Sequence, residues 1–226
     1  MTTRALTAIE ARVLAVLVEK QHTVPDSYPL SLNALTLGCN QKTAREPVMN
    51  LSEADVLQAI NGLKEFSLVT EVSGSRVVRF DHNAARGLGV PSQSAALLTL
   101  LVLRGPQTSA ELRLHTERLH RFADISSVEG FLNELAEREP IRVVRLPKAP
   151  GEREARWAHL LCGEVQLPPA SHLTAATASD GSGAQSETRA EIESLKAEVA
   201  DLKSLVHRLA AELGVSTDTP PQACAG

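Results

Sequence analysis

The chain has 226 residues, enough for one or two small domains that each bury a core. Aromatic residues make up only 3% of it, so the cores must be built on aliphatic side chains, which favours small helical modules over large pocketed enzymes. The formal net charge of −4 lies wholly beyond residue 165, because residues 1–89 carry 9 basic and 9 acidic side chains and residues 90–165 carry 10 of each. Neither of these parts has the net positive charge that is usual for a dedicated nucleic-acid-binding domain.

The cysteines and the apolar runs indicate the compartment. Cys39, Cys162 and Cys224 form no CxxC pair, and their odd number leaves any disulfide scheme incomplete, which suits a reducing compartment. The N-terminus lacks the apolar run of a signal peptide, and no stretch approaches the roughly 20 apolar residues of a membrane span. We therefore expect a soluble cytoplasmic protein without a membrane partner or a structural metal.

Residues 1–85 predict a winged-helix domain, which consists of three helices and a β-hairpin. Residues 7–10 form a capping box, and apolar residues follow it at helical spacing. Two prolines then break the chain before a short leucine-rich second helix. Residues 52–55 begin a third helix with one apolar stripe, and the strand-like runs 68–72 and 76–80 flank a Ser-Gly-Ser turn.

The same order of elements recurs in residues 86–165, which predict a second winged-helix domain. Residues 108–111 form another capping box, and either Asp124 or Ser126 caps the third helix of this copy. The apolar stripe of that helix matches the stripe of the first copy with a shift of 72 residues. Residues 141–161 supply two strands around a longer wing. The predicted fold class is therefore mainly α with small β-hairpins, an α+β protein of two tandem winged helices.

The remaining residues predict a linker, a coiled-coil helix and a disordered end. Residues 166–187 are rich in Ala, Ser, Thr, Gly and Pro and read as a flexible linker, and residues 215–226 as a disordered tail. Residues 188–214 have β-branched residues and leucines at alternating heptad positions, which favours a parallel homodimer. The predicted seam consists of Ile192, Leu195, Val199, Leu202, Val206, Leu209 and Leu213. The alternative is an amphipathic helix that packs on its own chain.

Three strings carry a resemblance to a known family, namely residues 16–35, 38–43 and 46–56. They resemble the bacterial YceH family, and the similarity runs from about residue 4 to residue 164. The resemblance implies tandem winged-helix domains in a cytosolic bacterial protein. It implies no activity and supplies no catalytic residues. Ala44 and Glu46 depart from the Asn and Asp that often stand in the family pattern.

The exposed face of the third helix is the usual DNA-reading surface of a winged helix, and here it is acidic in both copies. The predicted faces consist of Glu53, Asp55, Gln58, Asn61 and Glu65, and of Ser127, Glu129, Asn133, Glu134 and Glu137. Carboxylates beside phosphates are repulsive, so we expect any DNA contact to come from the wings and the 38–50 loop, through the DNA backbone.

Candidate nucleic-acid contacts are the basic and amide side chains outside the third helices. They are Asn40, Gln41, Lys42 and Arg45 in the loop, Arg76 and Arg79 in the first hairpin, Arg113, Arg118 and Arg121 around the second helix of the second copy, and Lys148, Arg153 and Arg156 in the second wing. The loop has an equally weighted alternative, in which it tucks against its own domain or against the second one.

No sequence motif indicates catalysis. The seven histidines show no metal-binding spacing, and there is no glycine-rich phosphate loop and no nucleophile motif. We therefore predict no catalytic, cofactor-binding or metal-binding residues. The leading hypothesis is a dimeric DNA-associated protein with a regulatory role. The alternative is a protein-interaction module or scaffold that uses the winged-helix surfaces without binding DNA.

Overall fold

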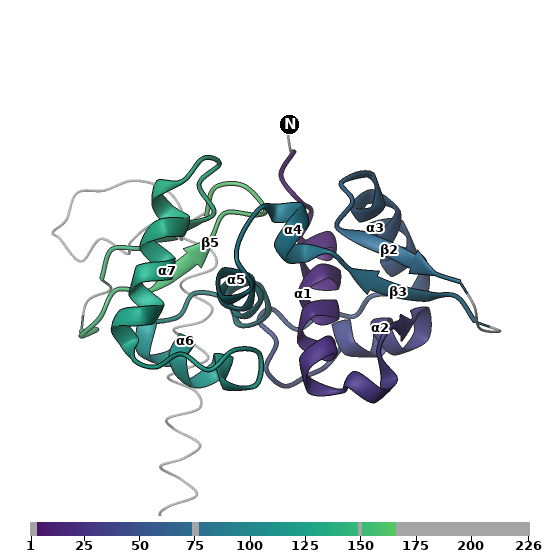
Figure 1. Cartoon of the computed structure of the whole chain (residues 1–226), viewed down its shortest axis with the longest axis horizontal. Helices are drawn as coiled ribbons and strands as arrows, with labels where there is room; N and C mark the ends of the chain where they lie inside the picture. Colours follow the sequence, from purple (N-terminus) through teal and green to yellow (C-terminus); the bar gives the residue numbers. More distant parts are fainter. Residues whose placement is uncertain (1–3, 74–76, 149–150, 166–226) are drawn as a thin grey trace, which may run out of the picture. The chain divides into compact units, whose positions relative to one another are not determined.

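The computed structural model describes residues 4–73, 77–148 and 151–165, and all of these belong to one compact unit (Figure 1). They are mainly helical with two small antiparallel sheets, as the sequence predicted. The predicted linker, the coiled-coil helix with its seam and the C-terminal tail lie outside the described residues, and so does Arg76. No helix among the described residues is both long and apolar enough to cross a membrane.

The described residues of the first half, 4–73 and 77–90, form five helices, including one 3₁₀ turn, and three strands. In chain order they are α1 (Ala8–Thr23), η1 (Pro25–Ser27), β1 (Leu30–Ser31), α2 (Leu32–Cys39), α3 (Glu53–Glu65), β2 (Val69–Val72), β3 (Arg79–His82) and α4 (Ala84–Leu88). The strands form one antiparallel sheet in the order β1-β3-β2, with Leu30 opposite Phe80 and Val69 opposite His82. The sequence predicted α1, α2, α3, β2 and β3, and it missed η1, β1 and α4.

The second half, residues 91–165, repeats the helices with a smaller sheet. Its elements are α5 (Ser92–Arg104), α6 (Ser109–His115), the 3₁₀ turn η2 (Thr116–Arg118), α7 (Ile125–Glu137), β4 (Val143–Arg145) and β5 (Trp157–His159). Strands β4 and β5 pair antiparallel, and they are shorter than the runs that predicted them. Of the two possible caps for α7, Asp124 is the one used, since its carboxylate accepts a hydrogen bond from Ser127 N.

Local hydrogen bonds explain where three of the helices begin. At each start a Ser or Thr side chain accepts from the amide three residues on, and the acidic residue there accepts from the capping residue's own amide. The capping residues are Thr7 for α1, Ser52 for α3 and Thr108 for α6. The two predicted capping boxes, at Thr7 and Thr108, are confirmed, and the predicted helix start at Ser52 is a third one.

Helices α1 and α5 pack against each other at the centre of the described residues, with the three-stranded sheet beyond α1 and the two-stranded sheet beyond α5 (Figure 1). Helix α1 is buried without interruption from Glu10 to Val18, because it contacts α2, α3 and α5 on different sides. Two backbone hydrogen bonds join the halves elsewhere, from Leu6 N to Leu161 O (2.8 Å) and from Glu46 N to Leu103 O (2.7 Å). The two halves therefore share one continuous apolar core.

Candidate nucleic-acid interface

Arg45, a candidate contact in the loop between α2 and α3, is buried. Its side chain is 0% exposed, and its guanidinium donates to both carboxylate oxygens of Glu19, at 2.5 and 3.1 Å. It also donates to Gln41 Oε1 at 2.7 Å and to Gly38 O at 3.3 Å. Arg45 and the Gln41 side-chain oxygen therefore hold the loop against α1, and the guanidinium is not available to a phosphate at the surface.

The rest of this loop is also tied to its own domain. The side-chain amide of Asn40 donates to Leu51 O (2.8 Å) and its oxygen accepts from Leu51 N (2.7 Å), which closes the loop at its base. Arg12, buried on α1, donates to Cys39 O (3.2 Å) and Pro47 O (2.7 Å). These contacts match the alternative in which the loop tucks against its own domain. Of the four loop candidates, Lys42 is the exposed basic side chain.

Two candidate arginines in the hairpins have internal partners. Arg79, on β3, donates to Pro29 O (2.7 Å) and Ser27 O (3.2 Å) and so holds the η1 turn against the sheet. Arg156 forms ion pairs with Glu111 and Glu152, both at 3.0 Å. The hydrogen bond to Glu152 is the largest cause of the raised pKa of Arg156, which keeps this guanidinium charged in its pairs. Both side chains are half-buried, and a phosphate would have to compete with these partners.

Besides Lys42 in the loop, five candidate basic residues are exposed and have no ion-pair partner within the described ranges, and all five lie in the second half. Two of them, Lys148 and Arg153, lie in the second wing. Three others, Arg113, Arg118 and Arg121, lie on α6 and in the connection from α6 to α7. The connection is ordered by aromatic contacts, because Phe122 packs edge-on against His120 (4.6 Å between ring centroids) and Phe131 (5.8 Å). This cluster of three arginines is the densest group of exposed, unpaired cations among the candidates.

The exposed faces of α3 and α7 are acidic, as expected. Glu53, Gln58, Asn61 and Glu65 on α3 are exposed, and so are the residues predicted on α7 except Ser127, which is half-buried. The carboxylate of Asp55 accepts from Ser52 N and Oγ, and these hydrogen bonds lower its pKa. Both helices therefore present carboxylates where a DNA-reading helix would present donors.

The structure also reveals two exposed leucines that the sequence reasoning missed. Leu37 on α2 and Leu114 on α6 are 65% and 68% exposed, more than any other large hydrophobic side chain of the described residues. Each lies six residues after the cap of its helix, Ser31 and Thr108 respectively, so the two positions are equivalent in the repeat. The equal spacing of both leucines from their caps is the signal in the sequence that indicates these positions.

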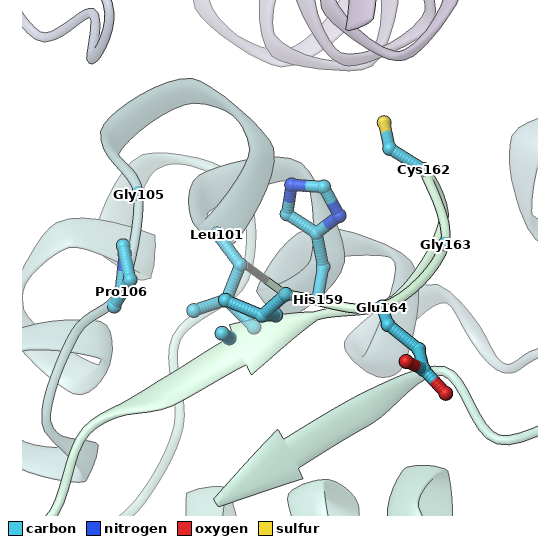
Figure 2. Close-up of a pocket in the computed structure, with 9 residues that line it drawn as sticks. Leu101, Gly105, Pro106, His159, Cys162, Gly163 and Glu164 are labelled. Atoms are coloured by element: carbon cyan, nitrogen blue, oxygen red, sulfur yellow. The ribbon is translucent and has the colours of Figure 1, made fainter. Parts of the chain in front are cut away.

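A pocket of about 190 Å³ lies between α5 and the segment that follows β5 (Figure 2). Its lining includes Leu101, Pro106, His159 and Cys162. Burial lowers the pKa of His159 to about 4, and burial is also the main cause of the raised pKa of the Cys162 thiol. At neutral pH the imidazole and the thiol are therefore both uncharged, and the pocket presents a mainly apolar surface.

Comparison with known proteins gives the family. Residues 6–152 match the model of a family described as "Protein of unknown function, DUF480". The chain belongs to the DUF480 family. A UPF0502 protein of Burkholderia thailandensis is 64% identical over 216 residues, which cover 95% of this chain and 92% of the relative. A UPF0502 protein of Leptothrix cholodnii is 63% identical over 219 residues, covering 96% and 99%.

Membership of a family of uncharacterised bacterial proteins is therefore confirmed, while the YceH resemblance stays a prediction. The DUF480 match includes the buried loop between α2 and α3 and the arginine cluster after α6, and it ends within the second wing. Both features that bear on the candidate interface thus lie within the part that defines the DUF480 family.

Proposed function

We propose that the chain is a cytoplasmic tandem winged-helix protein that associates with duplex DNA through its second half, without catalytic activity. The order helix, short strand, helix, helix and hairpin in the first half supports the winged-helix reading, as does its reduced repeat in the second half. The single observation that carries the DNA proposal is the cluster of Arg113, Arg118 and Arg121, exposed and without carboxylate partners in the described ranges. In a winged helix, the turn before the third helix lies beside the DNA backbone.

The proposed mode of binding is non-specific contact with phosphates. Glu129, Glu134 and Glu137 on the exposed face of α7 would meet the phosphates of a major groove, so sequence reading by this helix is disfavoured. Five cations are then available, the arginine cluster together with Lys148 and Arg153. If all five neutralise phosphates, a plot of the logarithm of the binding constant against the logarithm of the salt concentration should have a slope of about −4.5. The affinity should then fall about 500-fold between 50 and 200 mM salt.

A salt titration of the full-length protein with random duplex tests the proposal. We expect Arg118→Ala with Lys148→Ala to weaken binding to all sequences and to reduce the salt slope by about 2. Arg86→Ala is the matched control, because Arg86 is an exposed cation on α4 in the first half. Absence of binding at 50 mM salt would overturn the proposal.

The proposal includes a homodimer formed by residues 188–214, which lie outside the described residues. Two copies joined in this way would place two arginine clusters on one duplex and raise the apparent affinity. The mass of the full-length protein in solution, compared with that of a chain truncated after Glu164, tests this part. The measured mass, divided by the mass of one chain, gives the number of chains per particle. If both proteins are monomers or both are dimers, the C-terminal helix is excluded as the dimerising element.

A second candidate function is protein interaction, and the equivalent exposure of Leu37 and Leu114 favours it. An exposed leucine at the same position of both repeats suits an apolar contact with a partner protein better than a contact with phosphate. The two functions differ in the substitution to which they respond. A protein partner should be lost in Leu37→Ser with Leu114→Ser and retained in Arg118→Ala with Lys148→Ala, and duplex binding should show the reverse.

A further inference from the structure

A polar pocket lies beside α6, within the arginine cluster. It has a volume of about 190 Å³ and is lined by Arg113, Leu114, Glu117, Arg121 and Phe122, which we call the α6 pocket. One water occupies about 30 Å³ of the liquid, so the α6 pocket has room for a tetrahedral group of five heavy atoms, such as a phosphate. The lining differs from that of the pocket in Figure 2, which is mainly apolar.

Two arginines from different segments line the α6 pocket. Arg113 comes from α6, and its Nη2 is held by Ala123 O at 3.1 Å, which fixes the guanidinium over the connection to α7. Its Nε and Nη1 make no hydrogen bond within the described ranges, and neither does the guanidinium of Arg121. A planar guanidinium presents paired donors that match two phosphate oxygens. Because Arg113 is already ordered, binding loses less side-chain entropy there.

The residues that line the α6 pocket carry two positive charges and one negative charge. Glu117 is the one carboxylate in the described lining. Asp124 accepts from Ser127 N and Ser127 Oγ, both at 2.7 Å, and so caps α7. These hydrogen bonds, and then the charge of Arg113, lower the pKa of Asp124, so its negative charge stays near Arg113 and offsets part of the positive charge. Two guanidiniums thus face one carboxylate that has no ion-pair partner in the described part of the chain.

The first half has no counterpart of this pair. Arg113 lies five residues after the cap of α6, and Thr36 occupies the equivalent position on α2. The hydroxyl of Thr36 donates to Leu32 O at 2.9 Å within its own helix. The arginine of the following connection in the first half, Arg45, is buried against Glu19. Among the described residues, the two exposed arginines therefore have no arginine equivalent that is free to bind an anion in the first half.

We propose that the α6 pocket binds one phosphate group, held by the guanidiniums of Arg113 and Arg121. This inference rests on the proposed function for its favoured source, a backbone phosphate of duplex DNA, since the pocket lies in the connection before α7. A small phosphorylated molecule would present the same chemistry. Glu117 opposes binding, so it limits the affinity for a free phosphate.

The experiment uses full-length protein with two probes, inorganic phosphate and a random 15-base-pair duplex. Binding of phosphate is followed by the ¹H–¹⁵N signals of the arginine Nε groups, and binding of duplex by fluorescence anisotropy at 50 mM salt. We expect Arg121→Ala to lower the affinity for both probes about tenfold, the effect of losing one charge-assisted hydrogen-bonded pair. Glu117→Gln should raise the affinity for both, and Arg86→Ala should leave phosphate binding unchanged.

Arg121→Ala carries the test because the Arg121 side chain makes no hydrogen bond within the described residues, so its loss should not disturb the fold. Arg113→Lys keeps the charge but loses the planar donors, and it should weaken phosphate binding while leaving the circular dichroism spectrum unchanged. If both affinities fall, the source is the DNA backbone. If only phosphate binding falls, the α6 pocket is retained and its source is a small phosphorylated molecule.

The α6 pocket and the proposed function fail in different ways. Phosphate signals that are unchanged by Arg121→Ala and by Arg113→Lys overturn the pocket, while salt-dependent duplex binding that is sensitive to Arg118→Ala still supports the proposed function. A wild-type protein that binds no duplex at 50 mM salt overturns the proposed function. In that case a tenfold loss of phosphate affinity in Arg121→Ala still supports the α6 pocket.

Discussion

The buried charges behind the loop between α2 and α3 give the sharpest stability prediction. Arg12 and Arg45 are both buried, with 1% and 5% of the whole residue exposed, and Glu19 is the carboxylate that pairs with Arg45. Arg12 donates to the backbone carbonyls of Cys39 and Pro47 and pairs with no carboxylate of the described residues. Burial, and then the charge of Arg45, lower the pKa of Arg12. Glu19 therefore bonds one buried guanidinium and, by its charge, favours the charged form of the other.

Because two buried guanidiniums lie near one carboxylate, we expect substitution of Glu19 to destabilise the fold more than substitution of Arg45. Glu19→Gln leaves two buried guanidiniums without a bonded carboxylate, so we expect a loss of about 3–5 kcal/mol in the free energy of unfolding. Arg45→Met fills similar volume and relieves the repulsion on Arg12. The remaining Glu19 side chain is 16% exposed and has Lys20 at 3.5 Å, so we expect a loss of only about 1–2 kcal/mol.

Urea unfolding of the two variants and the wild type measures the difference. The dependence of the free energy on urea should keep its slope, because the same surface is exposed on unfolding. Lys64→Met is the control, since its ion pair with Glu71 lies at the surface and should contribute less than about 1 kcal/mol. The reasoning is refuted if Arg45→Met destabilises as much as Glu19→Gln, or if it leaves stability intact and weakens duplex binding.

Two further predictions concern glycines and histidines. Gly62→Ala should destabilise the protein by about 1–3 kcal/mol, because a Cβ at this position would overlap the buried carboxylate of Glu10. Gly130→Ala on α7 should instead stabilise it by about 1 kcal/mol, because a Cβ there meets nothing within 4 Å. Thermal unfolding of both variants measures these differences. Burial lowers the pKa of His82 and of His159 from 6.5 to about 4. As the pH drops, these histidines therefore take up protons in the unfolded chain before they do so in the folded one. The free energy of unfolding should fall between about pH 6.5 and pH 4, by up to about 1.4 kcal/mol per pH unit for each histidine. Urea midpoints at pH 7, 5.5 and 4.5 check this, and His159→Phe should reduce the slope; midpoints that do not change with pH would contradict it.

Helix starts could be predicted from the sequence because their physics is local. Thr7, Ser52 and Thr108 each have an acidic residue three positions on, and the reciprocal hydrogen bonds need only those four residues. The apolar stripe that repeats with a shift of 72 residues likewise places Val56 and Val128 in the core, and both are fully buried. The mainly helical fold follows from these features.

The candidate site could be predicted only in part, because the fate of a basic side chain depends on distant partners. Arg45 has the surroundings of a surface loop in the sequence, and its burial is decided by Glu19, 26 residues earlier. Strand β1 has two residues, too few for any periodic pattern, and exists because Leu30 lies opposite Phe80. Arg121 was predicted as a contact, but the pocket that it forms with α6 needed the structure.

The packing of α1 on α5 connects the buried loop to the arginine cluster and affects how loop variants must be read. Glu46, next to Arg45, donates its backbone amide to Leu103 O near the end of α5, and α6 begins five residues after α5 ends. A variant that loosens the loop can therefore disturb the second half, although the Arg45 guanidinium is buried. If the effect is only structural, duplex binding by Arg45→Met should fall in proportion to the unfolded fraction and recover at lower temperature. Loss of Arg121 should weaken binding at every temperature, because it removes a contact and leaves the fold unchanged.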